Sequence, residues 1–399
     1  MAARPATSDA DSEERSATPS QTSPRRFTTL DGLRGVAALA VVQYHASAFF
    51  GFQFPSSYLA VDLFFILSGI VIAHSYDGKL ASGMSVRGFT AARLVRLYPL
   101  YLVATAAGLA FVVANALAGN ADVGPAELGL SLVLSLMFLP TPGGLLGSED
   151  LFPLVHPAWS LFFELSVNLV YAVIFPLLSL RVLTALALSG AGLLVLTTFW
   201  FDGLNAGSHW GSFGGGIARV TFGFFTGVLL ARFPLRMRGS ATPALLSLAV
   251  MVLSFALPVS QAARPFHDLA VVLAVYPLVA AVAAASEAGP RTRSVFEYLG
   301  RLSYGIYVLH VPVIFWAMGI APRITGVQLA ELGPVAGVAV IATVCVLADL
   351  VDRLFDAPVR RRLGGWLGRG QRQAEAGSGE VAGGLTVAGV VPATVARPE

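Results

Sequence analysis

Residues 58–76 read YLAVDLFFILSGIVIAHSY, a stretch whose only acidic or basic side chain, histidine aside, is Asp62. A helix needs about 20 predominantly apolar residues to cross the hydrocarbon core of a bilayer. Comparable stretches lie near 32–52, 97–118, 127–140, 158–179, 182–201, 216–231, 242–258, 268–286, 298–318 and 333–353. Lipid cannot satisfy open backbone groups, and no strand-length alternation is present. We therefore expect an all-α, polytopic transmembrane helical bundle.

The composition agrees with a chain surrounded by lipid. Hydrophobic residues make up 55% of the 399 residues and charged residues only 12%, whereas a soluble domain is about a quarter charged. The formal net charge of +3 is too small to indicate nucleic-acid binding. The single cysteine, Cys345, excludes an internal disulfide framework or a cysteine metal site.

Basic residues flank alternate ends of the apolar stretches, and the positive-inside rule assigns them to the cytoplasm. They are Arg25, Arg26, Lys79, Arg87, Arg93, Arg96, Arg232, Arg236, Arg238, Arg291, Arg293, Arg360, Arg361 and Arg362. This pattern requires an even number of crossings, although there are eleven candidates. The shortest, 127–140, is bounded by prolines, so we predict a re-entrant or interfacial helix there and about ten spanning helices elsewhere.

The two ends of the chain differ in composition from the rest. Residues 1–26 and 363–399 are polar or low in complexity, and we predict that both are disordered and cytoplasmic. Residues 27–362 would form one membrane domain. The expected location is a bacterial inner membrane, with both termini in the cytoplasm.

Ionisable residues inside a span are costly and point to function. The sequence LDGLRG at 30–35 leads into Tyr44 and His45, which lies eleven residues after Arg34 and therefore ~16 Å along a helix. A membrane histidine can make a helix-to-helix hydrogen bond. It can equally act as a base, because its proton affinity lies near neutral pH.

Arg93 and Arg96 occur in RLVRLYP at 93–99 and share one helix face because they are three residues apart. Paired guanidinium groups at a membrane boundary suit a phosphate-bearing ligand, since they match phosphate oxygens bidentately. A plain positive-inside anchor is the equal alternative. We expect Pro99 to break or kink the helix.

Glu164 ends the sequence HPAWSLFFE at 156–164 and is surrounded by apolar residues. A carboxylate there must be paired, hydrated or protonated. It is either a functional group or the partner of an arginine on another span. Further along, Ser303, Tyr307 and His310 are four and three residues apart and line one helix face.

Other polar residues receive simpler interpretations. Ser68 and Gly69 would permit close helix approach, and Asp62 would be interfacial. His74, His209 and His267 receive no role. The histidines have no metal-binding spacing, and neither a Walker loop nor a dinucleotide fingerprint is present.

In their order, these segments resemble the membrane-bound acyltransferase 3 family over about residues 27–362. The shared motifs are LDGLRG (30–35) with YH (44–45), FFILSG (64–69), RLVRLYP (93–99), WSLFFE (159–164), SYGIYVLH (303–310) and DAP (356–358) followed by arginines. Asp356 stands where the family usually has Glu. After WSLFFE, residues 168–171 replace a common Phe-Tyr.

The resemblance implies that an acyl group, often acetyl, passes from cytoplasmic acyl-CoA to a hydroxyl. Family acceptors include surface polysaccharides, lipid-linked sugars and glycosylated antibiotics such as macrolides. No bound cofactor is expected beyond this donor substrate. Arg93 and Arg96, assisted by Arg34, would hold the CoA phosphates. His45 would be the general base, and Glu164 would orient it or stabilise its imidazolium.

The remaining candidate residues would shape the pocket or donate to the developing oxyanion. They are Trp159, Ser303, Tyr304, Tyr307 and His310. The alternative to acyl transfer is a transporter that exports a glycan or small molecule along the same polar residues. The absence of an evident internal repeat weighs against it. The sequence does not identify the acceptor.

Overall fold

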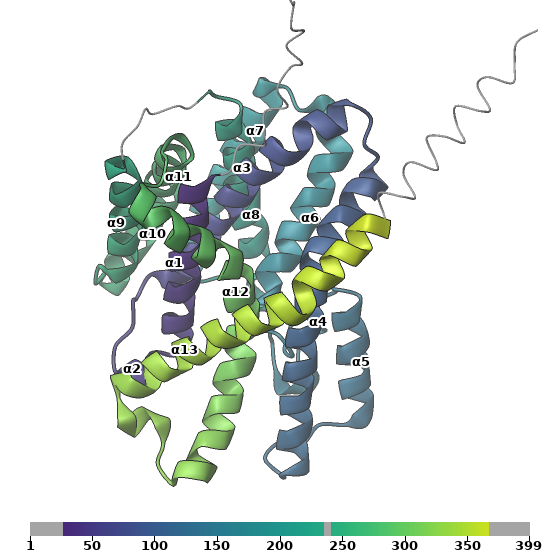
Figure 1. Ribbon diagram of the computed structural model, residues 1–399, viewed down its shortest axis with the longest axis vertical. Coiled ribbons are helices and arrows are strands. Elements are labelled where there is room, and N and C mark those ends of the chain that lie inside the picture. Colours follow the sequence, from purple (N-terminus) through teal and green to yellow (C-terminus); the bar gives the residue numbers. More distant parts are fainter. Residues whose placement is uncertain (1–26, 235–240, 367–399) are drawn as a thin grey trace, which may run out of the picture.

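The computed structural model describes residues 27–234 and 241–366 of the chain as a bundle of helices (Figure 1). Within these residues there is no strand, only an isolated bridge between Asp150 and His209. The α-helices are α1 (Thr28–His45), α2 (Ser47–Phe50), α3 (Ala60–Ala81), α4 (Val86–Leu117), α5 (Pro125–Leu136), α6 (Ala158–Ile174), α7 (Leu180–Trp200), α8 (Phe213–Ala231), α9 (Thr242–Ala256), α10 (Arg264–Ala270), α11 (Tyr276–Ala285), α12 (Pro290–Thr325) and α13 (Pro334–Val351). The predicted all-α polytopic bundle is confirmed.

Eight of the described helical stretches are long and apolar enough to cross a bilayer. They are Ser57–Ala81, Val86–Leu117, Ala158–Leu177, Leu180–Trp200, Trp210–Ala231, Gln261–Ala285, Pro290–Arg323 and Pro334–Trp366. The predicted count of about ten crossings needs α1 and α9 in addition, and α9, with fifteen residues, is itself shorter than a full span. At twelve residues α5 is ~18 Å long, too short to span ~30 Å of hydrocarbon, as the interpretation of 127–140 requires.

Several boundaries differ from those expected. α4 begins eleven residues before the predicted span and continues through Pro99, so this proline does not end the helix. The last helical stretch continues to Trp366, inside the segment assigned to the C-terminal tail. In Figure 1 it crosses the front of the bundle diagonally. The predicted disorder of 1–26 and of 367–399 lies outside the described residues.

Close packing of α1 against α12 depends on glycine. A Cβ atom at Gly35 would collide with Leu299, and one at Gly300 would collide with Asp31. With only hydrogen at these positions the two backbones approach closely. This packing fixes the end of α1, with His45, beside the middle of α12.

The connections between helices gather at the His45 end of α1. Residues 46–57, 138–157 and 201–212 lie there. Backbone hydrogen bonds join the second and third of these segments, such as Leu151 N–H to the Ser208 carbonyl at 2.9 Å. Buried side chains such as Leu151 and Phe152 hold residues 138–157 against the helices. We call this region the loop end. The opposite region, where α3 ends and α4 begins, is the basic end.

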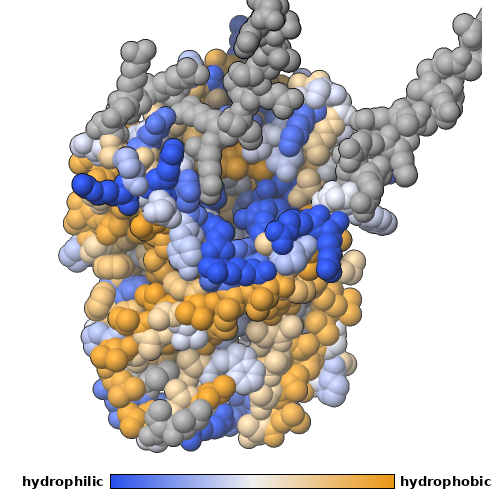
Figure 2. All heavy atoms as spheres, in the orientation of Figure 1, coloured by the Kyte–Doolittle hydropathy of each residue, from blue (hydrophilic) through white to orange (hydrophobic). Residues whose placement is uncertain are grey.

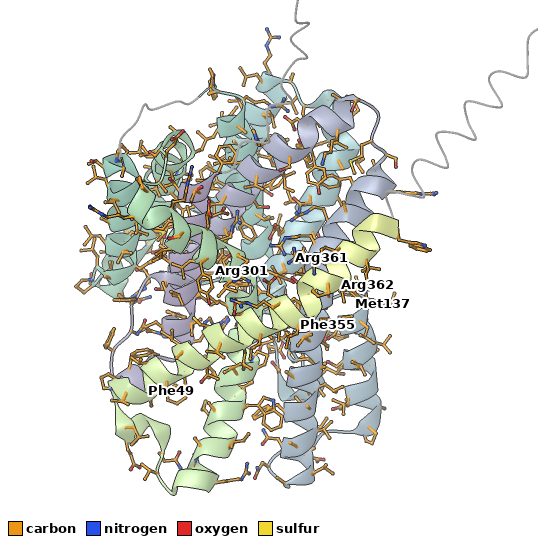
Figure 3. All side chains as sticks on the ribbon, viewed as in Figure 1. Phe49, Met137, Arg301, Phe355, Arg361 and Arg362 are labelled. Atoms are coloured by element: carbon orange, nitrogen blue, oxygen red, sulfur yellow. The ribbon has the colours of Figure 1, made fainter. Side chains whose placement is uncertain are left out.

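Hydrophobic side chains form a band over the lower half of the molecule, and hydrophilic ones gather above it (Figure 2). The hydrophilic patch lies where Figure 3 labels Arg301, Arg361 and Arg362. Arg301 contacts both Asp349 and Asp352 at 2.7 Å. An apolar band bordered by charge is what a bilayer-spanning bundle presents, and the protein is therefore a multi-pass membrane protein.

Candidate active site

A cavity of about 150 Å³ lies among α1, α3, α4, α6 and α12; we call it the basic-end cavity. Its lining includes seven of the residues predicted from the sequence. They are Arg34, Arg93, Arg96, Glu164, Ser303, Tyr304 and Tyr307. Residues far apart in the chain thus meet around one space, although none of the sequence spacings required this.

Glu164 pairs with Arg93, whose Nη2 lies 3.1 Å from the carboxylate, and accepts a hydrogen bond from Ser68 at 2.7 Å. The side chains of Arg93 and Glu164 remain 12% and 18% exposed. The Nε of Arg93 is buried without a partner. Of the two interpretations of Glu164, the geometry therefore favours the ion pair with an arginine on another helix. From the sequence, only a packing role was expected for Ser68.

Three guanidinium groups surround the basic-end cavity. Besides Arg93, Arg96 stacks over the Tyr304 ring at 5.5 Å, and Arg34 lies 3.6 Å from Asp31. Glu164 is the single carboxylate in the cavity lining. The cavity is therefore electropositive, and its guanidinium groups are suited to an anionic ligand.

A second, smaller cavity of about 50 Å³ lies towards the loop end; we call it the loop-end cavity. It contains the remaining predicted residues, His45, Trp159 and His310. Tyr307 and Val61 line both cavities. The Tyr307 hydroxyl is 2.7 Å from Ser160 Oγ, which donates to the Pro157 carbonyl. Tyr307 must therefore be the donor to Ser160, and the pair stands where the two cavities adjoin.

The hydrogen bonds of His45 and His310 assign their protons. His310 Nδ1 lies 2.6 Å from the Tyr307 carbonyl, so Nδ1 carries the proton and Nε2 accepts. His45 Nδ1 lies 3.0 Å from the Val41 carbonyl and 3.2 Å from His310 Nε2. It must donate to these acceptors. His45 Nε2 is thereby left with a free lone pair, on a side chain that keeps exposed surface.

The partner of His45 differs from the one expected. The sequence analysis paired His45 with Glu164, but Glu164 contacts Arg93 and Ser68, whereas His45 contacts His310. His310 is wholly buried, and its Nε2 would still accept the His45 Nδ1–H if His45 became an imidazolium. His310, and not Glu164, is therefore the residue that contacts the His45 ring in this structure.

A buried ion pair supports the loop-end cavity. Arg219 donates to both oxygens of Asp62, at 3.0 and 2.8 Å, and to the carbonyls of Ala206 and Tyr58. Its guanidinium lies 5.3 Å from the Trp159 ring. Asp62 is wholly buried, so its interpretation as an interfacial residue was wrong. Arg219 lies inside the predicted 216–231 span, and an arginine there is a signal that sequence reasoning missed.

Three further polar groups meet at the loop end. Asp150 Oδ1 lies 3.1 Å from His156 Nδ1 and 2.9 Å from His209 Nε2. Burial alone would raise the pKa of the Asp150 carboxyl, but the hydrogen bond and charge of His156 and the charge of His209 hold the pKa below its usual value. Asp150 therefore remains a carboxylate. In the described parts of the chain, no three His, Cys, Asp or Glu residues are arranged to hold a metal ion.

Comparison with known proteins identifies the family. The family described as an acyltransferase domain, acyltransferase 3, matches residues 27–352. The chain belongs to the acyltransferase 3 family. It is 28% identical to the acyltransferase MdmB of Streptomyces mycarofaciens over 378 residues, which cover 85% of this chain and 93% of that protein. It is also 51% identical over 162 residues to protein 2 in the picA locus of Rhizobium radiobacter, covering 38% of this chain and 84% of that protein. No solved structure matches.

Membership of the acyltransferase 3 family means that the two cavities belong to an enzyme that transfers an acyl group. This sets the transporter alternative aside. All ten residues predicted from the sequence line one or both cavities. Ser303 and Tyr304 donate their hydroxyl protons to the carbonyls of Gly300 and Leu97. Of the hydroxyls predicted to stabilise an oxyanion, only Tyr307 donates to a side chain.

Proposed function

We propose that this acyltransferase moves an acyl group, acetyl in the simplest case, from cytoplasmic acyl-CoA to a hydroxyl of a carbohydrate or glycosylated acceptor. The observation that carries the proposal is the adjacency of the two cavities. One has guanidinium groups, and the other has a histidine with a free Nε2, and they share Tyr307. Donor and acceptor would enter from opposite ends and meet at that residue.

The distribution of charge supports this orientation. Arg87 and Lys79 are exposed at the basic end, and the positive-inside rule assigns that end to the cytoplasm. The loop end would then face away from the cytoplasm across a bacterial inner membrane. Both ends of the 27–362 membrane domain would be cytoplasmic.

The basic-end cavity is the proposed binding site of the acyl donor. Arg34, Arg93 and Arg96 would bind the phosphates of acyl-CoA through charge-assisted hydrogen bonds. The pantetheine arm would extend along the cavity and bring the thioester to Tyr307. Arg93 could exchange Glu164 for a phosphate oxygen, because this pair is only partly buried.

His45 is the proposed base of the chemical step. Its Nε2 would remove the proton of the acceptor hydroxyl as the oxygen attacks the thioester carbonyl. The carbon–sulfur bond then breaks and CoA leaves as the thiolate. His310 would accept the Nδ1–H of the imidazolium, and the Tyr307 hydroxyl would turn from Ser160 to the oxyanion. Trp159 would form part of the acceptor site.

The test is transfer of label from [14C]acetyl-CoA in detergent, where transport has no meaning. The acceptor source is the glycolipid and polysaccharide fraction of cells that carry the gene. We expect His45→Ala to lower kcat by about 10²- to 10⁴-fold, the usual contribution of a general base, with the KM for acetyl-CoA unchanged.

His74→Ala is the matched control, since His74 contacts the Phe27 ring edge to face and lines neither cavity. It should leave both constants unchanged. Full transfer by His45→Ala at equal expression would refute the base assignment. Wild-type protein that transfers no label from acetyl-CoA would refute the donor.

A further inference from the structure

The proposed mechanism leaves a row of polar side chains unused at the loop end. His156 precedes α6, and Asp150 and His209 lie on the two connections that meet there. The ring centroids of His45 and His156 are 5.9 Å apart, and those of His156 and His209 are 6.0 Å apart. Together the three histidines form a row from the proposed base, which itself keeps exposed surface, to His209, whose side chain is 52% exposed.

The space between His45 and His156 suits water. Both residues line the loop-end cavity, whose volume of about 50 Å³ is enough for a few water molecules. Ser208 and Asn205 add polar groups to the same lining. No direct hydrogen bond joins these two described imidazoles, and one bridging water in the cavity would connect them.

Asp150 fixes which nitrogen of His156 faces this space. The carboxylate only accepts hydrogen bonds, so His156 Nδ1, at 3.1 Å, must donate to it. Nε2 of neutral His156 is then an acceptor. The carboxylate also stabilises a positive charge on His156, as in other carboxylate–histidine pairs. His156 can therefore take up a proton and hold it briefly.

We propose that His156, positioned by Asp150, carries the proton taken up by His45 to the solvent at the loop end. This proposal rests on the proposed function. The acceptor O–H bond breaks, and His45 Nε2 takes the proton. The proton then passes through a water molecule to His156 Nε2 and is released to solvent beside His209. The oxygen–carbon bond forms and the carbon–sulfur bond breaks. The CoA thiolate takes a proton from solvent at the basic end, so each turnover consumes one proton there and releases one at the loop end.

The experiment is chemical rescue in the labelled-acetyl transfer assay. His156→Ala should lower kcat by about a hundredfold, the lower range for a proton-transfer group, with the KM for acetyl-CoA unchanged. Added imidazole should restore the rate, and a series of substituted imidazoles should restore it in order of basicity. Asp150→Asn should cause a smaller loss, because His156 remains but its orientation is lost.

Two results would overturn the proposal. One is an unchanged kcat in His156→Ala. The other is a loss that no imidazole restores and that accompanies lowered thermal stability, since that marks a purely structural contact between the connections. His74→Ala, tested with and without imidazole, is the control for non-specific effects of the amine. If wild-type protein fails to transfer label, the proposed function fails; if only the His156 result is negative, the relay alone fails.

Discussion

An arginine of each cavity lining pairs with a carboxylate, and the two pairs differ in burial and in bonding. At the basic end, Arg93 and Glu164 share one contact at 3.1 Å, are 12% and 18% exposed, and leave the Arg93 Nε without a partner. At the loop end, Arg219 and Asp62 are 1% and 0% exposed and share two hydrogen bonds. The first pair keeps access to solvent and an unused donor, whereas the second is fully enclosed.

The physical reason is desolvation. A charge removed fully from water remains stable only while its partner and its hydrogen bonds are in place. Arg219 therefore serves to join α3, α8 and the connections through Asp62, Ala206 and Tyr58. A partly exposed guanidinium has less to lose when its partner changes, which suits a site that binds and releases an anion.

The largest effect should come from breaking the buried pair. Asp62→Asn leaves the Arg219 charge without a counter-charge, and we expect it to lower the free energy of unfolding by about 3–5 kcal/mol. Thermal unfolding of the purified protein in detergent measures this. Asp349→Asn is the control, because its partners Arg301 and Arg353 are 36% and 61% exposed, and it should cost about 1 kcal/mol or less. Equal losses of unfolding free energy in the two variants would contradict the distinction between the buried and the exposed ion pairs.

The next effect concerns the exchangeable pair. Arg93→Ala should raise the KM for acetyl-CoA at least about tenfold, because a hydrogen bond to a charged group is worth about 1.5–3 kcal/mol. Arg87→Ala, an exposed arginine on the same helix, should leave the KM unchanged. Glu164→Gln should keep kcat while lowering the KM, since Arg93 would lose its competing carboxylate. A fall in kcat would instead return Glu164 to the role of partner to His45.

The sequence predicted the parts of the fold and site that depend on local pattern. The lengths of the apolar stretches predicted where the helices lie, and the motifs identified ten residues that line the two cavities. The sequence did not predict which residues pair across distant helices. Asp62 and Arg219, for example, are 157 residues apart, and only tertiary packing joins them. The contact between His45 and His310 was not predicted for the same reason, since they are 265 residues apart. Asp150 and His209 lie in connections, where no periodicity indicates neighbours.

The smallest effect should come from replacing Asp150, which lies outside the spans. Its side chain is 25% exposed, more than either of the two carboxylates compared above. The folded state holds the pKa of its carboxyl below the usual value, so the contacts with His156 and His209 stabilise the fold above the unfolded pKa of about 3.9. This stabilisation is lost as the pH falls through the lower folded value.

Wild-type protein and Asp150→Asn should therefore differ in unfolding free energy by about 1 kcal/mol or less near pH 7. The difference should shrink as the pH falls below about 4 and disappear only below the lowered folded pKa, because the wild-type carboxyl is then protonated in both states and resembles the amide. Thermal unfolding of both proteins across this range measures it. A difference that grew with acid would mean that the folded state favours the protonated carboxyl, and Asp150 would then belong with the buried charges of the loop end rather than with the exchangeable ones.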